Sequence, residues 1–109
     1  MQLLTVKTPV CCGPDTPALP AAEAVELAAR FKALADPTRV AILNRLARAE
    51  QTCVCDLTAT FELSQPTISH HLRVLRDAGL VDVTRRGTWA FYRVVPEALT
   101  ALSSAITPR

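Results

Sequence analysis

Four cysteines are the residues of this 109-residue chain best suited to chemistry, and they form two pairs, Cys11-Cys12 and Cys53-Val54-Cys55. Thiolate sulfur is a soft ligand, which binds soft metal and metalloid ions in preference to hard cations. Neither pair has the wider spacing of a zinc-finger half-site. The first residues lack the basic region followed by an apolar stretch that is typical of an export signal. We therefore expect a cytoplasmic chain whose cysteines are thiols.

A second group of functional side chains, which can form hydrogen bonds, lies in the stretch 61–79. This stretch is predicted to be a short turn followed by a capped helix. Ser64 suits the N-cap and Gly79 suits the left-handed position that ends a helix. Ile68, Leu72 and Leu75 recur at helical spacing and are expected to face a core. The opposite face carries side chains suited to base edges and phosphates in a major groove. These are Ser64, Gln65, Thr67, Ser69, His70 and Arg73.

A β-hairpin is expected next. Residues 80–84 alternate and are rich in β-branched side chains, and residues 88–94 return as a second strand. Arg85, Arg86 and Gly87 are predicted to form the turn, so that both arginines can contact a DNA backbone or minor groove. Residues 64–93 carry a net charge of +3, whereas the rest of the chain carries −1. This distribution favours local contact with phosphates.

The remaining elements must position these groups. Residues 1–20 are rich in proline and are expected to form an arm, whereas residues 21–109 are expected to form one domain. Helices are predicted over 21–35, from Asp36-Pro37 to about 49, from Val54 or Cys55 to Phe61, and from Pro96 to about 106. The short last helix needs a packing partner, for which the first helix is the obvious candidate. The predicted fold is mainly α with a small β-hairpin, a winged helix-turn-helix.

Other classes of protein are disfavoured. The chain has no apolar run long enough to cross a membrane. It also has no nucleophile–base constellation and no phosphate-cradling glycine loop, so we expect neither an enzyme nor an organic cofactor. A two-fold dimer is expected on physical grounds, because two winged domains double the phosphate contacts and contact two half-sites.

With this order of elements, the chain closely resembles the ArsR/SmtB family of bacterial metal-responsive repressors. Three motifs carry the resemblance in the order of that family: residues 31–39 (FKALADPTR), 53–57 (CVCDL) and 64–72 (SQPTISHHL). The resemblance extends from about residue 25 to the end. It implies a homodimer, formed through the first and last helices, that binds double-stranded operator DNA and releases it when a toxic ion binds.

The resemblance also implies where that ion binds. A family site of His and carboxylate ligands in the last helix is absent, because that helix has only Glu97. Residues 53–57 are similar to the cysteine box of that family, and similar members build a sulfur site from the arm of one subunit and the cysteine box of the other. As(III) or Sb(III) takes three thiolates, for which we choose Cys11, Cys12 and Cys55, with Cys53 the fourth sulfur. All four would suit Cd(II) or Pb(II). A thiol redox switch and a structural zinc module are the remaining alternatives.

Overall fold

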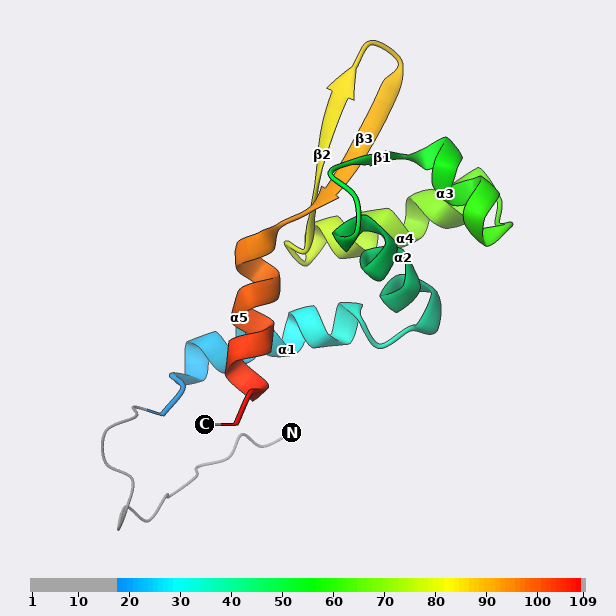
Figure 1. The fold of residues 1–109 in the computed structure, drawn as a ribbon. Helices are drawn as coiled ribbons and strands as arrows, with labels where there is room; N and C mark the ends of the chain where they lie inside the picture. Colours follow the sequence, from blue (N-terminus) through cyan, green and yellow to red (C-terminus); the bar gives the residue numbers. More distant parts are fainter. Residues whose placement is uncertain (1–17, 109) are drawn as a thin grey trace.

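A computed structural model describes residues 18–108, which fold into helices and a small sheet (Figure 1). Cys11, Cys12 and most of the expected arm lie outside the described residues. The described elements are, in chain order, α1 (Ala21–Ala33), α2 (Pro37–Ala47), β1 (Thr52–Cys53), α3 (Val54–Phe61), α4 (Gln65–Asp77), β2 (Val81–Arg86), β3 (Trp89–Val94) and α5 (Pro96–Ile106). The expected architecture, mainly helical with one hairpin, is confirmed. Within residues 18–108, no helix has the length and apolar character needed to cross a bilayer.

Helices α2 and α4 begin where local chemistry predicts, whereas α1 and α2 each end about two residues earlier than expected. Asp36 caps α2, because its Oδ2 accepts hydrogen bonds from the backbone N–H groups of Thr38 at 3.0 Å and Arg39 at 3.1 Å. Ser64 caps α4 and accepts from the N–H of Thr67. At the other end Gly79 has a φ of 78°, a left-handed conformation that ends α4 without a steric penalty. Local signals therefore fix both ends of α4, which we call the recognition helix because its polar face is predicted to contact DNA.

The sheet differs from the expected hairpin in two respects. Its strand order is β1-β3-β2, because the two-residue strand β1, expected to be a loop before the short helix, pairs with β3. Arg85 and Arg86 also belong to β2 and not to the turn, since Arg86 pairs with Trp89 and leaves only Gly87 and Thr88 as the loop. Glycine at a φ of 63° allows this two-residue connection. The hairpin is therefore longer and its tip is narrower than predicted.

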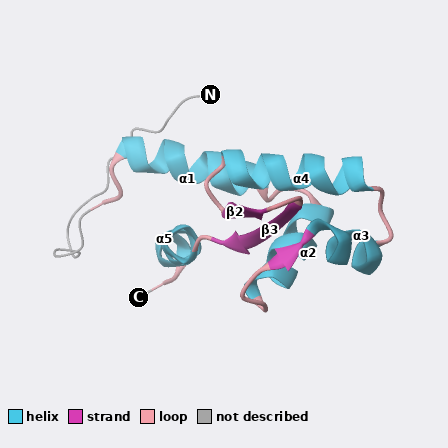
Figure 2. Cartoon of the chain, turned by 90° about the horizontal axis from the view of Figure 1, so that it is seen from above, coloured by secondary structure: helices cyan, strands magenta, loops and turns pink. Residues whose placement is uncertain are grey.

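The core lies where α2, α3, α4 and the base of the hairpin meet. Its fully buried side chains include those expected on α4, namely Ile68, Leu72 and Leu75, together with others from each of these elements: Ile42, Leu46, Leu57, Leu80 and Val81. Seen from above, α1 and α4 lie on one side of the molecule, whereas α2 and α5 lie on the other (Figure 2). Burial of one face of α4 in this core leaves its opposite face available to solvent.

Helices α1 and α5 pack on each other away from the hairpin (Figure 1). Leu27 and Ala33 of α1 and Ala98 and Leu102 of α5 are buried. The apolar side chains of the two helices are only partly covered, because Val25 of α1 remains 64% exposed and Ile106 of α5 remains 66% exposed. Both helices therefore retain exposed apolar surface among residues 18–108.

Candidate nucleic-acid interface and cysteine site

All six polar residues predicted on the recognition helix are exposed in the structure: Ser64, Gln65, Thr67, Ser69, His70 and Arg73. They separate into two stripes. Gln65, Ser69 and Arg73 are spaced four residues apart, and they line one cavity, which Arg76 extends by one turn. Thr67 and His70 do not line that cavity. Helix α4 therefore presents hydrogen-bonding groups and cations on its free surface, as direct contact with DNA requires.

Two arginines attach α4 to the preceding helices. Arg30 of α1 donates from Nε to the carbonyl oxygen of Ala78 at 3.1 Å, and it thereby satisfies a group at the end of α4. Arg39 donates from Nε to the carbonyl oxygen of Ala33 at 2.7 Å, and its Nη1 lies 3.2 Å from His71 Nδ1. Arg39 thus joins the end of α1 to the recognition helix through its own helix α2, so all three helices hold one relative orientation.

His71 differs from its neighbour His70. It is half-buried, and burial lowers its pKa below the usual 6.5, although the carboxylate of Asp36 acts in the opposite direction. Nδ1 of the neutral ring can accept from Arg39, which always donates. His70 is exposed. Burial thus separates the two histidines, and contact between the exposed His70 and DNA stays a prediction.

The two arginines of the wing, which is the β2–β3 hairpin, have different surroundings. They are consecutive residues of β2, so their side chains point to opposite faces of the hairpin. Arg85 lines the cavity beside α4, whereas the guanidinium of Arg86 lies 5.7 Å from the ring centroid of Phe91. Contact between DNA and either side chain stays a prediction, and the cavity distinguishes Arg85 as the one that shares a surface with the recognition helix.

The cysteine box lies at the junction between β1 and α3. Cys53 is the N-cap residue of α3 and is buried, whereas Cys55 is in the first turn of the helix and is exposed. Residues two apart within a helix point in nearly opposite directions, so both sulfurs can meet only if Cys53 precedes the helix. That expectation is confirmed. Cys53 also pairs with Phe91 of β3, which fixes the box against the wing.

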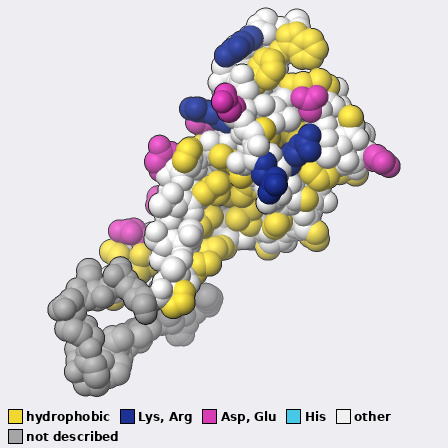
Figure 3. Space-filling model, in the orientation of Figure 1, with side chains coloured by type: hydrophobic (Ala, Val, Ile, Leu, Met, Phe, Trp, Pro, Cys, Tyr) yellow, Lys and Arg dark blue, Asp and Glu magenta, His cyan; other side chains and the backbone are white. Residues whose placement is uncertain are grey.

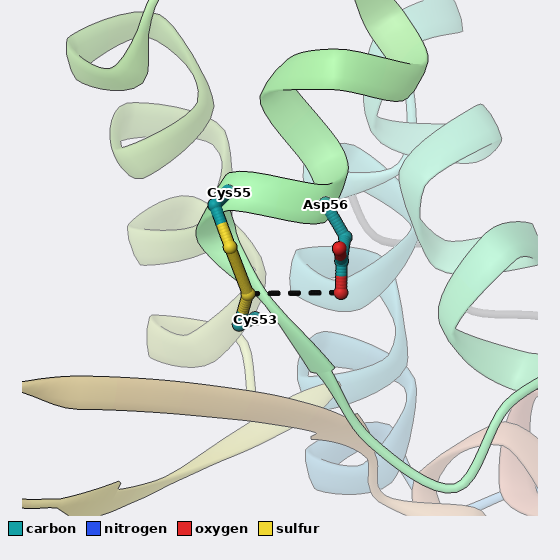
Figure 4. A group of neighbouring side chains, drawn as sticks. All are labelled: Cys53, Cys55 and Asp56. Carbon is teal, nitrogen blue, oxygen red and sulfur yellow. Dashed lines mark hydrogen bonds between the residues drawn. A yellow bond between two sulfur atoms is a disulfide. The ribbon is translucent and has the colours of Figure 1, made fainter.

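The two sulfur atoms form a disulfide in the structure, where free thiols were expected (Figure 4). Asp56 lies beside them, with its Oδ2 3.6 Å from Cys53 Sγ. A disulfide sulfur has no proton, so this contact is a hydrogen bond only when Cys53 is a thiol. The ligand atoms of Cys53, Cys55 and Asp56 lie within 4.8 Å of one another. Two sulfurs and a carboxylate oxygen this close together fit a soft or borderline ion once the pair is reduced.

A partly open cavity of about 490 Å³ joins the cysteine box to the predicted DNA-contacting elements. Cys53, Cys55 and Thr58 form one part of its lining, α4 forms another, and the wing contributes Arg85 and Trp89. Sequence reasoning missed Arg76 and Trp89. Helical spacing from Arg73 could have indicated Arg76, whereas Trp89 depends on how the hairpin folds against α4.

These features define a winged helix-turn-helix protein, with a recognition helix, a hairpin wing and a sulfur-containing site between them. A sequence profile described as "Bacterial regulatory protein, arsR family" matches residues 36–83. The "Arsenical resistance operon repressor" of Bacillus subtilis (strain 168) is 44% identical over 75 residues, which cover 69% of this chain and 71% of that protein. The chain therefore belongs to the ArsR family, and it is a transcriptional regulator, not an enzyme.

Other relatives and solved structures agree with this assignment. The "Arsenic resistance transcriptional regulator ArsR1" of Pseudomonas putida is 51% identical over 62% of this chain and 52% of its own length. A "Cadmium resistance transcriptional regulatory protein CadC homolog" of Staphylococcus aureus is 37% identical over 72% of this chain and 64% of its own. A homodimeric winged helix-turn-helix domain from Mycobacterium bovis, a possible ArsR-family regulator, has a TM-score of 0.68 at 29% identity and covers 77% of this chain and 78% of that one.

Proposed function

We propose that this protein is a transcriptional repressor that binds operator DNA as a homodimer and releases it when As(III) or Sb(III) binds its cysteine thiolates. The observation that carries the proposal is the position of Cys55. Its side chain is exposed in the first turn of α3, and it lines the same cavity as the recognition helix and the wing. An ion bound there lies next to the surface that contacts DNA.

The DNA-binding part of the proposal rests on the exposed face of α4 and on the charge around it. Arg73 and Arg76 of this helix face the same cavity as Arg85 of the wing. Guanidinium groups suit phosphate oxygens, whereas Gln65 and Ser69 suit base edges. Both kinds of side chain line one cavity, which supports contact with the DNA backbone and with base edges from the same surface.

Dimerisation is supported by the apolar surface of α1 and α5. Val25 is 64% exposed and Ile106 is 66% exposed, and Phe31 is partly exposed as well. On the face seen in Figure 3, hydrophobic side chains gather along and beside α5. Exposed apolar area of this kind favours a protein interface. We infer that α1 and α5 of two chains pack together, so that two recognition helices contact two half-sites of a two-fold operator.

For the sensor we propose Cys11, Cys12 and Cys55 as the three thiolates of a trigonal As(III) site. Cys11 and Cys12 lie outside the described residues, and their role rests on the family resemblance and on the reach of an extended arm. Cys53 is the fourth sulfur, and a site with all four would suit Cd(II) or Pb(II). Because β1 pairs with β3, a displacement at the box also acts on the wing. A coupling of about 1–3 kcal/mol between the sites is typical of such regulation.

The test is a titration of reduced, operator-bound protein with arsenite, antimonite, cadmium, lead and zinc, followed by fluorescence anisotropy of the DNA. Cys55→Ser should keep operator affinity and lose release by arsenite. Cys53→Ser is the matched control: it should keep release by arsenite if three sulfurs suffice, and it should lose release by cadmium if that ion needs four. Continued release from the Cys55→Ser protein by both ions would refute the site.

One observation favours a second candidate function, control by thiol oxidation. Cys53 and Cys55 are paired as a disulfide, so two thiols of this box can be joined without an intermolecular partner. Formation of the bond removes two protons and passes two electrons to an oxidant such as peroxide. The oxidised pair offers no thiolate to an ion. Release of DNA by peroxide, together with no response to arsenite or cadmium, would identify this function in place of ion sensing.

A further inference from the structure

The charged side chains that line the cavity beside the cysteine box are all arginines. Arg73 and Arg76 approach it from α4, and Arg85 approaches it from β2. Within residues 18–108, the one salt bridge is between Arg93 and Asp82, so these three guanidinium groups have no carboxylate partner there. No aspartate or glutamate of the described residues lines the cavity. Asp56 lies beside Cys53 but outside this lining. Three cations that line a concave surface without a carboxylate in the lining create a positive potential that attracts an anion.

The position of the cavity indicates which anion it takes. Its walls are the recognition helix and the wing, which are the two elements proposed above to contact DNA. A guanidinium group matches the oxygens of a phosphodiester and donates to two of them at once. A free anion could use the same groups, but a DNA backbone would engage both walls together, because it passes along the surface on which they open.

We propose that this cavity is a phosphodiester-binding site for the operator backbone, and that Cys55 forms part of its wall, so bulk added to the Cys55 sulfur competes directly with DNA. The inference deepens the proposed function and rests on it. Arg76 becomes a phosphate contact in addition to Arg73 and Arg85. Release then follows from mutual exclusion within one cavity, and it needs no change in the spacing between the two subunits.

The exposure of the two cysteines makes Cys55 the competing group. Cys53 is only 7% exposed and is held in β1, whereas Cys55 is exposed in the first turn of α3. An ion bound to the Cys55 sulfur would occupy volume in the cavity that the arginines also line. Because both occupants would fill the same cavity of about 490 Å³, the DNA-bound and ion-bound forms exclude each other locally.

The experiment adds bulk at Cys55 without any ion. Full-length protein carrying Cys11→Ser, Cys12→Ser and Cys53→Ser keeps Cys55 as its single thiol and is alkylated, after folding, with the uncharged reagent N-ethylmaleimide. The matched control also carries Cys55→Ser and Ala59→Cys, which moves the thiol to another exposed position of α3 that does not line the cavity. Circular dichroism before and after alkylation verifies that both proteins remain folded.

Alkylation at Cys55 should weaken operator binding at least tenfold, whereas alkylation at the control position should change it less than twofold. Saturating operator should slow alkylation of Cys55 at least tenfold and leave the control thiol unaffected. Operator affinity within twofold of the unmodified protein after complete alkylation of Cys55 would overturn the inference, as would equal protection of both thiols. If wild-type protein still releases DNA with arsenite in that case, the proposed function stands and only the shared cavity fails.

Discussion

Replacement of Arg73 by alanine should change the salt dependence of operator binding by a predictable amount. Arg73 is exposed on α4 and lines the cavity without an ion pair among residues 18–108. Each phosphate neutralised by a protein cation contributes about 0.9 to the slope of log affinity against log salt concentration. The proposed dimer loses two such contacts, so the slope should become shallower by about 1.8.

This change is large enough to measure. Over an increase of about fourfold in salt, from about 50 to about 200 mM, the wild-type protein should lose about tenfold more affinity than Arg73→Ala. Anisotropy titrations of a labelled operator at several salt concentrations provide both slopes. Arg45→Ala is the control, since Arg45 is exposed on α2 and does not line the cavity. An unchanged slope for Arg73→Ala would remove this side chain from the phosphate contacts and would contradict our reading of the cavity.

Three further predictions concern the scaffold. Leu72→Ala should lower the free energy of unfolding by about 2–5 kcal/mol in urea titrations, because this fully buried side chain anchors α4 to the core. Burial lowers the pKa of His71, so its contribution to the free energy of unfolding should be fully present above about pH 6.5 and should be lost as the pH falls through the lowered pKa. His71→Gln should flatten this pH dependence in a series of denaturant titrations, and an unchanged profile would exclude His71 as its cause. Val25→Glu should shift sedimentation toward the monomer, because a charge then replaces apolar surface on α1, and a fully dimeric variant would place the interface elsewhere.

Much of the recognition helix could be predicted because its determinants are local. The cap at Ser64, the stop at Gly79 and the buried spacing of Ile68, Leu72 and Leu75 all act within a few residues of the chain. They fix the limits of the helix and also determine which of its polar side chains remain exposed. The same reasoning placed Asp36 at the start of α2, where its carboxylate accepts two backbone hydrogen bonds.

The hairpin shows where local reasoning ends. Glycine at position 87 correctly indicated a reversal, but Arg85 and Arg86 were placed in the turn, whereas they continue β2. Strand β1 was missed because two residues have no periodicity of their own and become a strand only by pairing with β3. Because both arginines were placed in the turn, the sequence predicted them to be equivalent. In the structure Arg85 lines the cavity, whereas Arg86 lies over the ring of Phe91.

The amino-acid sequence by itself determined the family, the order of the helices and the presence of four soft sulfur side chains, since these depend on residue types and short spacings. The tertiary structure alone decided that Cys53 is buried while Cys55 is exposed, and that three arginines from two separate elements converge beside them. The physical reason is that burial and convergence depend on contacts between segments far apart along the chain, which form only when α4, the wing and the cysteine box pack together.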